Sequence, residues 1–299
     1  MADPDLSLIV AVKDGRDNVL PLLAALKARD TSTEIILACA GPPPADLPSD
    51  VSAISLPADT LTPSLWSEGI ERARGSRVAL TTAQFVPDLN WLTRLQFADL
   101  DRWVGVGGAI DNDPKASALN WAIFFLRYSA FAPPLVAGET DEIAADNAVY
   151  DRAAILEHRD LLAEGFWEPS FHRLFRSAGR KLALDPDLVL VHHGTVTAEA
   201  FARQRYEHGG AYGIERAARG GMARNLVLLL SSPLVPPLLL ARIISRIARK
   251  PAYRGKLITA FPWLVRFTLA WGRGEAGGYA STLGARRRGA IENETRRHA

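Results

Sequence analysis

The sequence predicts an α/β protein with a doubly wound, mostly parallel sheet. Two observations carry this prediction. Short apolar runs alternate with helical segments through most of the chain, and the runs are typical of buried strands of the parallel type. In open sheets of this class, ligands bind outside the carboxyl ends of the strands. Polar residues that directly follow a strand are therefore the first candidates for function.

The predicted strands are short apolar runs bounded by turn-forming or charged residues. They cover residues 6–12, 34–40, 51–56, 78–80, 103–110, 182–184 and 188–193. The predicted helices show apolar residues at helical spacing or a capping residue at one end. They cover residues 20–27 (capped by Asn18), 64–73, 118–128, 170–178 (ended by Gly179) and 201–217. A further helix opens at Pro87-Asp88, and residues 146–152 form a polar loop that enters a helix.

Composition narrows the class of protein. Of the 299 residues, 48% are hydrophobic and 23% are charged, which is typical of one large domain or a domain with an appendage. The net charge of +2 argues against a general nucleic-acid binder. Cys39 is the single cysteine, so no disulfide can form within the chain. The N-terminus has no signal-sequence pattern, so we expect the bulk of the protein in the cytoplasm.

The C-terminal quarter differs in character. Residues 226–240 and 257–271 are almost entirely apolar and have basic residues on both sides, and each is shorter than the roughly 20 residues of a spanning helix. We therefore expect helices that lie in or dip into one membrane leaflet; an ordinary helical layer packed on the rest of the protein is the alternative. The basic residues at the end indicate an anionic membrane surface, or a solvated tail.

These features divide the chain into three parts. We expect a domain over residues 1–220, an apolar, membrane-associated helical segment over residues 221–285, and a basic, disordered tail over residues 286–299.

Four segments resemble, in order and spacing, the motifs of family-2 glycosyltransferases, which are inverting enzymes with the nucleotide-sugar-binding GT-A fold. Leu8–Asp14 resembles the family's first strand and donor-binding turn. Ala73–Leu92 resembles its metal-motif segment, which in relatives reads ARG-D-x-(apolar)-T-D-D-D-x-x-P-D-x-x-W-L. Asp146–Arg152 is similar to its G-N-x-x-x-R-R loop, and Trp167–Gly179 resembles its E-D-x-x-(L/F) helix. The resemblance covers about residues 6–217.

The resemblance implies a GT-A fold and the transfer of a sugar from a nucleoside-diphosphate sugar with inversion. It also implies a set of donor-binding residues at strand ends and in the loop that resembles G-N-x-x-x-R-R. On this chain these are Val12, Asp14, Cys39, Thr82, Gln84, Asp146 and Asn147.

Two departures from the family pattern bear on this donor site. Relatives usually have an acidic residue after the second strand, where this chain has Cys39, and Asp-x-Asp where it has Thr82-Ala83-Gln84. A divalent cation on a diphosphate needs hard, anionic oxygen ligands, which a hydroxyl and an amide do not supply. The Mg²⁺ or Mn²⁺ usual in the family is therefore either absent or held by other residues. We assign no metal ligand.

Inversion needs a carboxylate that takes the proton of the acceptor hydroxyl during in-line attack. In the family this base is the Asp of the E-D pair. Helix register counted back from Gly179 places Glu168 there, with Trp167 in place of the neighbouring Glu. The alternative is a glutamate that is simply favoured at the positive end of a helix.

Without a metal, the leaving diphosphate needs positive charge or hydrogen-bond donors from elsewhere. The candidates for contact with phosphate or acceptor are His192, His193, Gln204 and Arg205. Gln204-Arg205-Tyr206 is loosely similar to the Q-x-x-R-W element of processive relatives, with a different spacing. A structural role is the alternative for the two histidines, and ligation of a metal by one of them is a third.

Together, these observations predict a hexosyltransferase at the cytoplasmic face of the inner membrane, peripheral or monotopic. The apolar C-terminal segments suggest a lipid-linked, glycolipid or polysaccharide acceptor, in envelope or exopolysaccharide assembly. The alternative is a degenerate member that kept the fold without turnover and serves as a binding or scaffold subunit. The missing acids motivate this alternative, whereas Glu168 and the Asp146-Asn147 loop argue against it.

Overall fold

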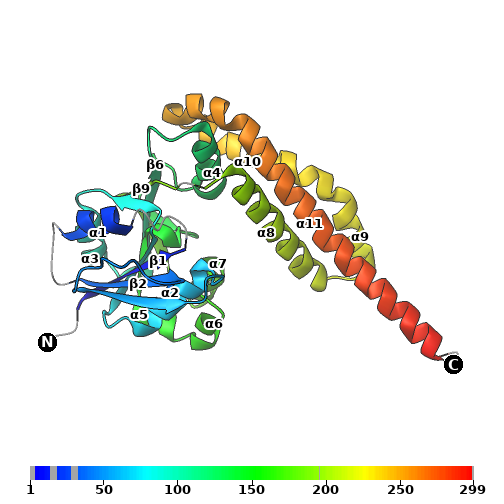
Figure 1. Cartoon of the computed structure of the whole chain (residues 1–299), viewed down its shortest axis with the longest axis horizontal. Helices are drawn as coiled ribbons and strands as arrows, with labels where there is room; N and C mark the ends of the chain where they lie inside the picture. Colours follow the sequence, from blue (N-terminus) through cyan, green and yellow to red (C-terminus); the bar gives the residue numbers. More distant parts are fainter. Residues whose placement is uncertain (1–3, 14–18, 28–32, 195, 298–299) are drawn as a thin grey trace. The chain divides into compact units, whose positions relative to one another are not determined.

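The computed structural model describes residues 4–13, 19–27, 33–194 and 196–297, except for the side chains of Lys27 and of residues 286–297. The chain forms two compact units (Figure 1). Unit 1 comprises residues 1–116 and 130–195, and unit 2 comprises residues 117–129 and 196–299. The second unit thus takes in one helix from the middle of the chain and begins well before residue 220, where we had placed the boundary.

Unit 1 is built on a mixed sheet whose strands, in the described residues, follow the order β3-β2-β1-β4-β8-β6-β9-β5, with β7 paired to β9 (Figure 1). β1 to β4, β6 and β9 run in the same direction; β8 lies antiparallel between β4 and β6, and β5 and β7 are antiparallel to β9. The strands are β1 (Leu6–Val12), β2 (Glu34–Ala40), β3 (Val51–Leu56), β4 (Arg77–Thr82), β5 (Phe85–Pro87), β6 (Gly105–Asn112), β7 (Gly138–Thr140), β8 (Ala148–Asp151) and β9 (Leu182–His192). The predicted α/β fold with a mostly parallel sheet is confirmed.

Helices cover this sheet, and their apolar faces form a core with it. The described residues of unit 1 include the helices α1 (Val19–Lys27), α2 (Thr62–Arg72), α3 (Trp91–Gln96), α5 (Arg152–Leu156), α6 (Arg159–Ala163) and α7 (Glu168–Ser177) and the 3-10 turn η2 (Ala145–Asn147). All seven residues of β1 are buried, as its uninterrupted apolar run predicts. One core cluster joins Leu80 of β4, Trp66 of α2 and Phe171 of α7.

The end of α7 shows why its register could be read from the sequence. Gly179 has a φ of +73°, a backbone conformation that favours glycine. Its N–H donates to the Arg176 carbonyl at 3.0 Å, and the Arg180 N–H donates to the Phe175 carbonyl at 2.8 Å. These two bonds form a Schellman motif, so the predicted C-terminal role of Gly179 is confirmed.

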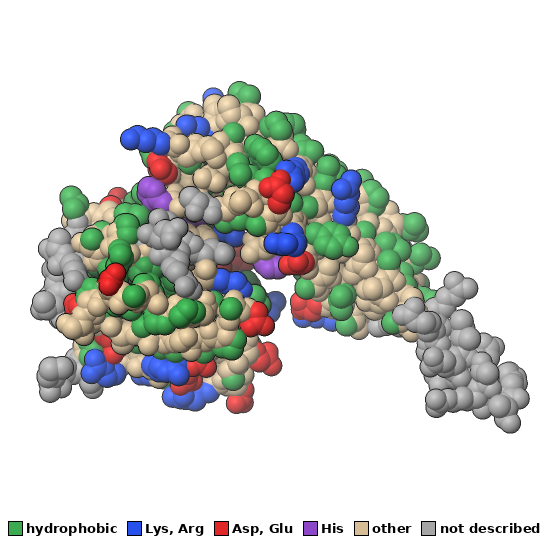
Figure 2. Space-filling model, in the orientation of Figure 1, with side chains coloured by type: hydrophobic (Ala, Val, Ile, Leu, Met, Phe, Trp, Pro, Cys, Tyr) green, Lys and Arg blue, Asp and Glu red, His purple; other side chains and the backbone are tan. Residues whose placement is uncertain are grey.

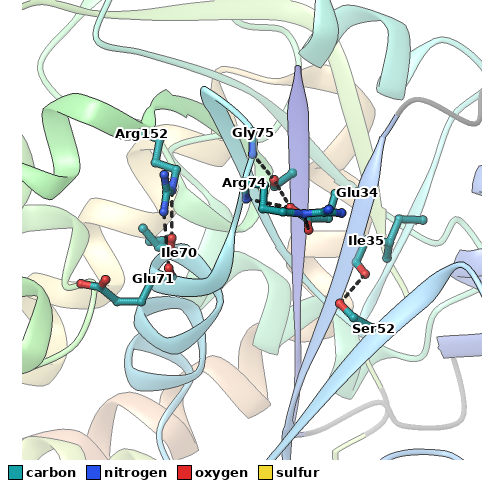
Figure 3. Close-up of polar contacts among 9 residues, drawn as sticks. Glu34, Ile35, Ser52, Ile70, Glu71, Arg74, Gly75 and Arg152 are labelled. Atoms are coloured by element: carbon teal, nitrogen blue, oxygen red, sulfur yellow. Dashed lines mark hydrogen bonds and ion pairs between the residues drawn. The ribbon is translucent and has the colours of Figure 1, made fainter. Parts of the chain in front are cut away.

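Polar contacts tie the amino ends of the strands together (Figure 3). The Glu34 carboxylate accepts hydrogen bonds from Ser7 Oγ at 2.6 Å and from the Arg74 backbone N–H and Nε at 2.8 and 2.7 Å. Burial opposes ionisation of this carboxyl, but the Ser7 and Arg74 hydrogen bonds prevail and lower the pKa of Glu34. Arg152 donates to the Ile70 and Glu71 carbonyls at the end of α2 (Figure 3). The side chains at the amino ends of the strands therefore serve to hold the sheet together. Candidate ligand-binding residues are to be sought at the opposite edge, where the parallel strands have their carboxyl ends.

Three predicted segments of unit 1 were wrong in detail. The polar loop predicted over residues 146–152 contains β8, because Ala148-Val149-Tyr150 is a buried run too short to recognise as a strand from its pattern. The two late strands predicted at residues 182–184 and 188–193 form the single strand β9, which passes an irregularity opposite Gly108/Ala109. The helix predicted to open at Pro87 begins at Trp91, after the unpredicted β5.

Unit 2 is helical. Its elements are α4 (Ala118–Tyr128), α8 (Ala198–Ala218), α9 (Met222–Ser231), η3 (Ser232–Leu234), α10 (Val235–Ala248), η4 (Pro251–Tyr253) and α11 (Arg254–Arg297). α8 and α11 pack along one another (Figure 1). Trp121, Phe124 and Phe125 of α4 lie 5.8, 6.4 and 6.3 Å from Tyr253, measured between ring centroids. The aromatic spacing of α4 therefore serves packing within this unit.

The first apolar stretch is longer than the sequence suggested. Residues Met222–Ala248 form one helical run of 27 residues that is long and apolar enough to cross a membrane, by length and composition. The prolines interrupt it little, because Pro236 and Pro237 occupy the first turn of α10, where no intrahelical N–H bond is needed. The backbone of α11 continues to Arg297, where we had predicted a disordered tail.

Candidate functional site

The carboxyl ends of the parallel strands bring several predicted site residues to one edge of the sheet. Val12 is opposite Cys39 in the β1–β2 pair, and Ala11 is opposite Thr82 in the β1–β4 pair. β8 runs in the opposite direction, so its beginning, with Asp146 and Asn147 before it, lies at the same edge. Asp14 falls outside the described residues. The remaining donor-site candidates therefore share an edge, as predicted from strand direction.

The polar tip of β4 folds back onto the end of β9. Gln84 is almost fully buried, and its carbonyl accepts a hydrogen bond from the His193 N–H at 2.7 Å. Phe85 is directly opposite His192 in the β5–β9 pair. The Thr82 hydroxyl is buried and has no hydrogen-bond partner among the described residues. The Thr81 hydroxyl is likewise buried without a partner among the described residues, but Thr82 is the partly exposed one of the two. An unpaired buried hydroxyl costs free energy, so Thr82 Oγ1 is a group that a ligand could satisfy.

Asn147 has a structural role at this edge. Its side chain is fully buried; Oδ1 accepts from Trp91 Nε1 at 2.7 Å, and Nδ2 donates to the Ala109 and Leu188 carbonyls at 2.8 and 2.9 Å. Both amide hydrogens are thus used in joining β6 and β9 at the irregularity, while Oδ1 joins them to α3. The side chain of Asn147 therefore holds strands β6 and β9 and helix α3 together at this edge.

Glu168 opens α7 beside η2. Its Oε2 accepts a hydrogen bond from the Ala145 N–H at 3.3 Å. The residue as a whole is partly exposed, while protein atoms surround its carboxyl. This burial, then the charges of Asp146 and Glu142, raise the pKa of Glu168 to about 8, while the Ala145 hydrogen bond opposes the rise. A carboxyl with a pKa near neutrality is suited to proton transfer.

A buried aromatic layer lies in the neighbourhood of Glu168. Tyr150 Oη and His172 Nε2 are 3.1 Å apart in a hydrogen bond, and Phe166 packs on Tyr150 with ring centroids 5.2 Å apart. Burial, then Arg176, lower the pKa of His172 to about 4, whereas burial, then Glu168 and Asp146, raise the pKa of Tyr150. Both groups are therefore neutral at physiological pH, and Glu168 is the titrating member of this neighbourhood.

The two histidines have different environments: His192 is the last residue of β9, and His193 follows the strand. His192 is buried, its Nδ1 lies 3.1 Å from Asn112 Oδ1, and its ring packs edge-on against Phe85 at 5.5 Å. His193 is partly exposed, and its Nδ1 lies 3.5 Å from Asp113 Oδ2. His192 thus fits the structural alternative, and His193 is the member that can meet a ligand.

The residues at the tip of β4 do not fit a divalent cation. Thr82, Ala83 and Gln84 supply no carboxylate, and the Thr82 hydroxyl is a neutral oxygen. Asp111 and Asp113 at the end of β6 are acidic, but Asp111 accepts from the Asn112 N–H and Asp113 from the Lys115 N–H. In the part of the chain that the structure describes, no three His, Cys, Asp or Glu side chains gather in a way that could hold a metal ion.

Gln204 and Arg205 belong to unit 2. Both lie on α8, where Gln204 Oε1 accepts from Arg127 Nη2 at 3.1 Å, and the Arg205 guanidinium stacks 4.2 Å above the Trp271 ring. The four residues that we predicted for phosphate or acceptor contact are therefore divided between the two units.

With this geometry in view, comparison with solved structures identifies the fold. The mannosyltransferase PcManGT from Pyrobaculum calidifontis, in complex with GDP-Man and Mn²⁺, is similar over 92% of this chain and 88% of that chain. The TM-score is 0.53 and the sequence identity 13%. The fold resembles GT-A. No family model matches the sequence, and no curated protein sequence matches it.

The sequence analysis did not include two residues of the candidate site, Trp167 and Asp113. Trp167 is 43% exposed beside Glu168, with its indole N–H donating to the Glu164 carbonyl at 3.0 Å. An exposed tryptophan next to a candidate base is a signal that could have been read as an acceptor contact. Asp113 was missed because its pairing with His193 depends on the β6–β9 register, which the merged strand β9 concealed.

Proposed function

We propose that this chain is a family-2 glycosyltransferase of the GT-A type that transfers a hexose from a nucleoside-diphosphate sugar to an acceptor with inversion. The observation that carries the proposal is the position of the Glu168 carboxyl, which accepts from the Ala145 N–H at the carboxyl edge of the sheet and has its pKa raised to about 8. The likeness to a mannosyltransferase that binds GDP-Man supports the choice of a nucleotide-sugar donor.

The proposed reaction is a single displacement. The acceptor hydroxyl loses its proton to the Glu168 carboxylate as its oxygen attacks the anomeric carbon. The bond from that carbon to the diphosphate oxygen breaks on the opposite side, and the nucleoside diphosphate leaves. The exposed Trp167 indole offers an apolar face to the acceptor beside the base.

The donor would lie along the strand ends. Val12 and Cys39 would form the floor near the nucleoside, and the Thr82 hydroxyl and the partly exposed His193, which lies beside Asp113, would be near the diphosphate. The Mn²⁺ that accompanies GDP-Man in the similar structure has no matching carboxylates at residues 82–84 here. The proposed reaction therefore uses the residues of this chain and no metal ion.

The acceptor is proposed to be membrane-associated, and the protein to act at the cytoplasmic face of the inner membrane. Support comes from unit 2, where the apolar run Met222–Ala248 is largely exposed and basic residues follow it. Such a surface fits the interfacial region of an anionic bilayer.

The test is release of nucleoside diphosphate from a panel of nucleotide sugars by the purified full-length protein. We expect release that persists in EDTA and falls about 100- to 10,000-fold in Glu168→Gln, because general-base catalysis contributes about that factor. Glu164→Gln is the matched control, since Glu164 is an exposed glutamate four residues away. Release that disappears in EDTA would contradict the metal-free donor site.

A second candidate is a binding or scaffold subunit without turnover. The neutral Thr82-Ala83-Gln84 tip favours it, because the family's charge-stabilising acids are missing there. The same panel decides between the two. Nucleotide binding without release, unaffected by Glu168→Gln, supports the scaffold; absence of both binding and release excludes the enzyme.

A further inference from the structure

An arginine of unit 2 is held in a partly buried position without an acidic partner. Arg205 on α8 makes no ion pair within the described residues, and its Nε is buried and has no hydrogen-bond partner there. Its guanidinium stacks on the Trp271 ring, with 4.2 Å from Cζ to the ring centroid. Burial, and then the charge of Arg127, lower the pKa of Arg205 to about 10. The group nevertheless stays protonated at physiological pH.

The favourable contacts of Arg205 are weaker than the free-energy cost of burying its charge. A cation–π contact is a modest interaction. Removing an unpaired charge from water costs more free energy than such a contact returns, and a second cation nearby adds repulsion. The stacking on Trp271 therefore does not compensate fully for the position of Arg205, which indicates a group that an anion would satisfy.

Two neighbouring side chains, Arg127 and Gln204, add further hydrogen-bond donors beside Arg205. Arg127 on α4 donates through Nη2 to Gln204 Oε1 at 3.1 Å, and its guanidinium lies 5.2 Å from the Phe201 ring centroid. Because Oε1 of Gln204 accepts from Arg127, the amide N–H groups of Gln204 remain available as donors. Arg127, Gln204 and Arg205 are each partly exposed, so a ligand can reach them.

We propose that Arg127, Gln204 and Arg205 form a phosphate-binding site for the head group of a lipid-linked acceptor. Guanidinium groups match the oxygens of a phosphate with paired hydrogen bonds. The assignment to a lipid follows from the exposed apolar residues of α9 and α10 in the same unit, among them Leu230 and Leu238. Recognition of a phosphate is inferred from the arrangement of these side chains. The assignment of that phosphate to the acceptor rests on the proposed function.

The experiment measures co-sedimentation of the full-length protein with phosphatidylcholine vesicles, with and without phosphatidic acid. We expect phosphatidic acid to increase binding, and Arg205→Gln to remove about 10-fold of that increase, the loss of one or two charge-assisted hydrogen bonds. The matched control is Arg203→Gln, which removes one exposed positive charge from the same helix. Equal losses in both variants would reduce the effect to surface charge and overturn the site.

Thermal unfolding in the absence of phosphate separates binding from a structural role. A ligand-binding arginine held without a partner predicts that Arg205→Gln melts at or above the wild-type temperature while losing its response to phosphatidic acid. A lower melting temperature together with an unchanged lipid response would overturn the proposal. Arg127→Gln provides an independent variant with the same expected loss of response.

Inorganic phosphate distinguishes the two sources of the ligand. Arg205-dependent stabilisation by phosphatidic acid vesicles, beyond that by inorganic phosphate, supports a lipid head group. An effect of inorganic phosphate alone would overturn the lipid assignment. Failure of the proposed function is separately visible, because nucleotide-sugar turnover and its dependence on Glu168 are measured without phosphatidic acid.

Discussion

Glu168 shows how the surroundings of one carboxyl decide its protonation. As the first residue of α7, it lies at the positive end of a helix, which favours the charged form by about 0.3–1 kcal/mol. Its crowded position and the neighbouring acids act in the other direction, and the pKa rises to about 8. Burial therefore outweighs the helix end, and the alternative of a glutamate placed only for the helix dipole does not account for this environment.

The raised pKa of Glu168 predicts a pH-dependent stability. Between the usual value of 4.5 and about 8, the folded protein holds a proton that the unfolded chain has lost, so stability falls as the pH rises through this window. Glu168→Gln removes this loss. We expect the variant to gain about 1–3 kcal/mol in free energy of unfolding relative to wild type above pH 8, after allowance for partial exposure.

Chemical denaturation across this pH range measures the difference between the two proteins. Glu164→Gln serves again as the control for replacing a nearby exposed glutamate by glutamine. A difference between wild type and Glu168→Gln that stays constant from acid to alkaline pH would show that the Glu168 pKa is not raised.

At the residue scale, the sequence predicted which residues lie at the carboxyl edge of the sheet better than it predicted their hydrogen-bond partners. Strand direction alone was enough to gather Val12, Cys39 and Thr82 at one edge, because parallel strands end together. The role of Asn147 could not be predicted, since its partners Trp91 and Leu188 are far away in sequence. The difference between His192 and His193 could not be predicted either, because the predicted strand ran to His193 whereas β9 ends at His192.

At the scale of elements, glycines decide how closely α8 and α11 pack. A Cβ on Gly274 would overlap the Tyr206 carbonyl, and one on Gly213 would overlap the Glu275 carbonyl. Within α11, the buried Glu275 accepts from Tyr279 Oη at 2.5 Å and from Trp271 Nε1 at 3.0 Å, and its Oε1 lies 3.5 Å from Arg216 Nη1 of α8. The close backbone approach of the two helices is therefore accompanied by an ion pair between them.

Gly274→Ala is expected to destabilise the protein by about 1–3 kcal/mol, because the added methyl meets backbone atoms that cannot rotate away. Thermal or chemical unfolding measures the loss. The control is Gly255→Ala in the same helix, where no atom lies within 4 Å of the new methyl. That change should stabilise the helix by about 0.5–1 kcal/mol. Equal effects at the two positions would contradict the close crossing.

The elements that the sequence missed have a common cause. β5 has three residues and β8 has four. Runs this short do not show an apolar pattern that distinguishes a strand from the neighbouring loops. They exist because neighbouring strands offer unpaired backbone groups, a tertiary effect that no local signal reports. Four elements, β1, β2, β3 and α4, have the predicted bounds.

At the scale of the whole molecule, exposed apolar side chains are concentrated on unit 2 (Figure 2). Leu230 and Leu238 are 72% and 66% exposed on α9 and α10. Contiguous surface of this kind marks an interaction site rather than ordinary exposure. The proposed membrane association depends on this surface.

The double variant Leu230→Ser/Leu238→Ser is expected to shift the protein from the membrane to the soluble fraction, because each buried leucine contributes about 1.5–3 kcal/mol to partitioning. Fractionation of cells that express the variant measures the shift. Phe97→Ser is the control, since Phe97 is 82% exposed but lies in unit 1. Unchanged membrane association in the double variant would remove α9 and α10 as the anchor.

The placement of α4 has a consequence for how the protein is made. The chain contributes α4 to unit 2 and then returns to unit 1 before supplying α8 to α11. During synthesis, the aromatic residues of α4 emerge long before Tyr253, their packing partner. Unit 1 can complete its sheet once β9 has appeared, while α4 waits for the C-terminal helices with its apolar face uncovered. Chains released early, or shortened before Tyr253, would keep that face exposed and be prone to aggregate.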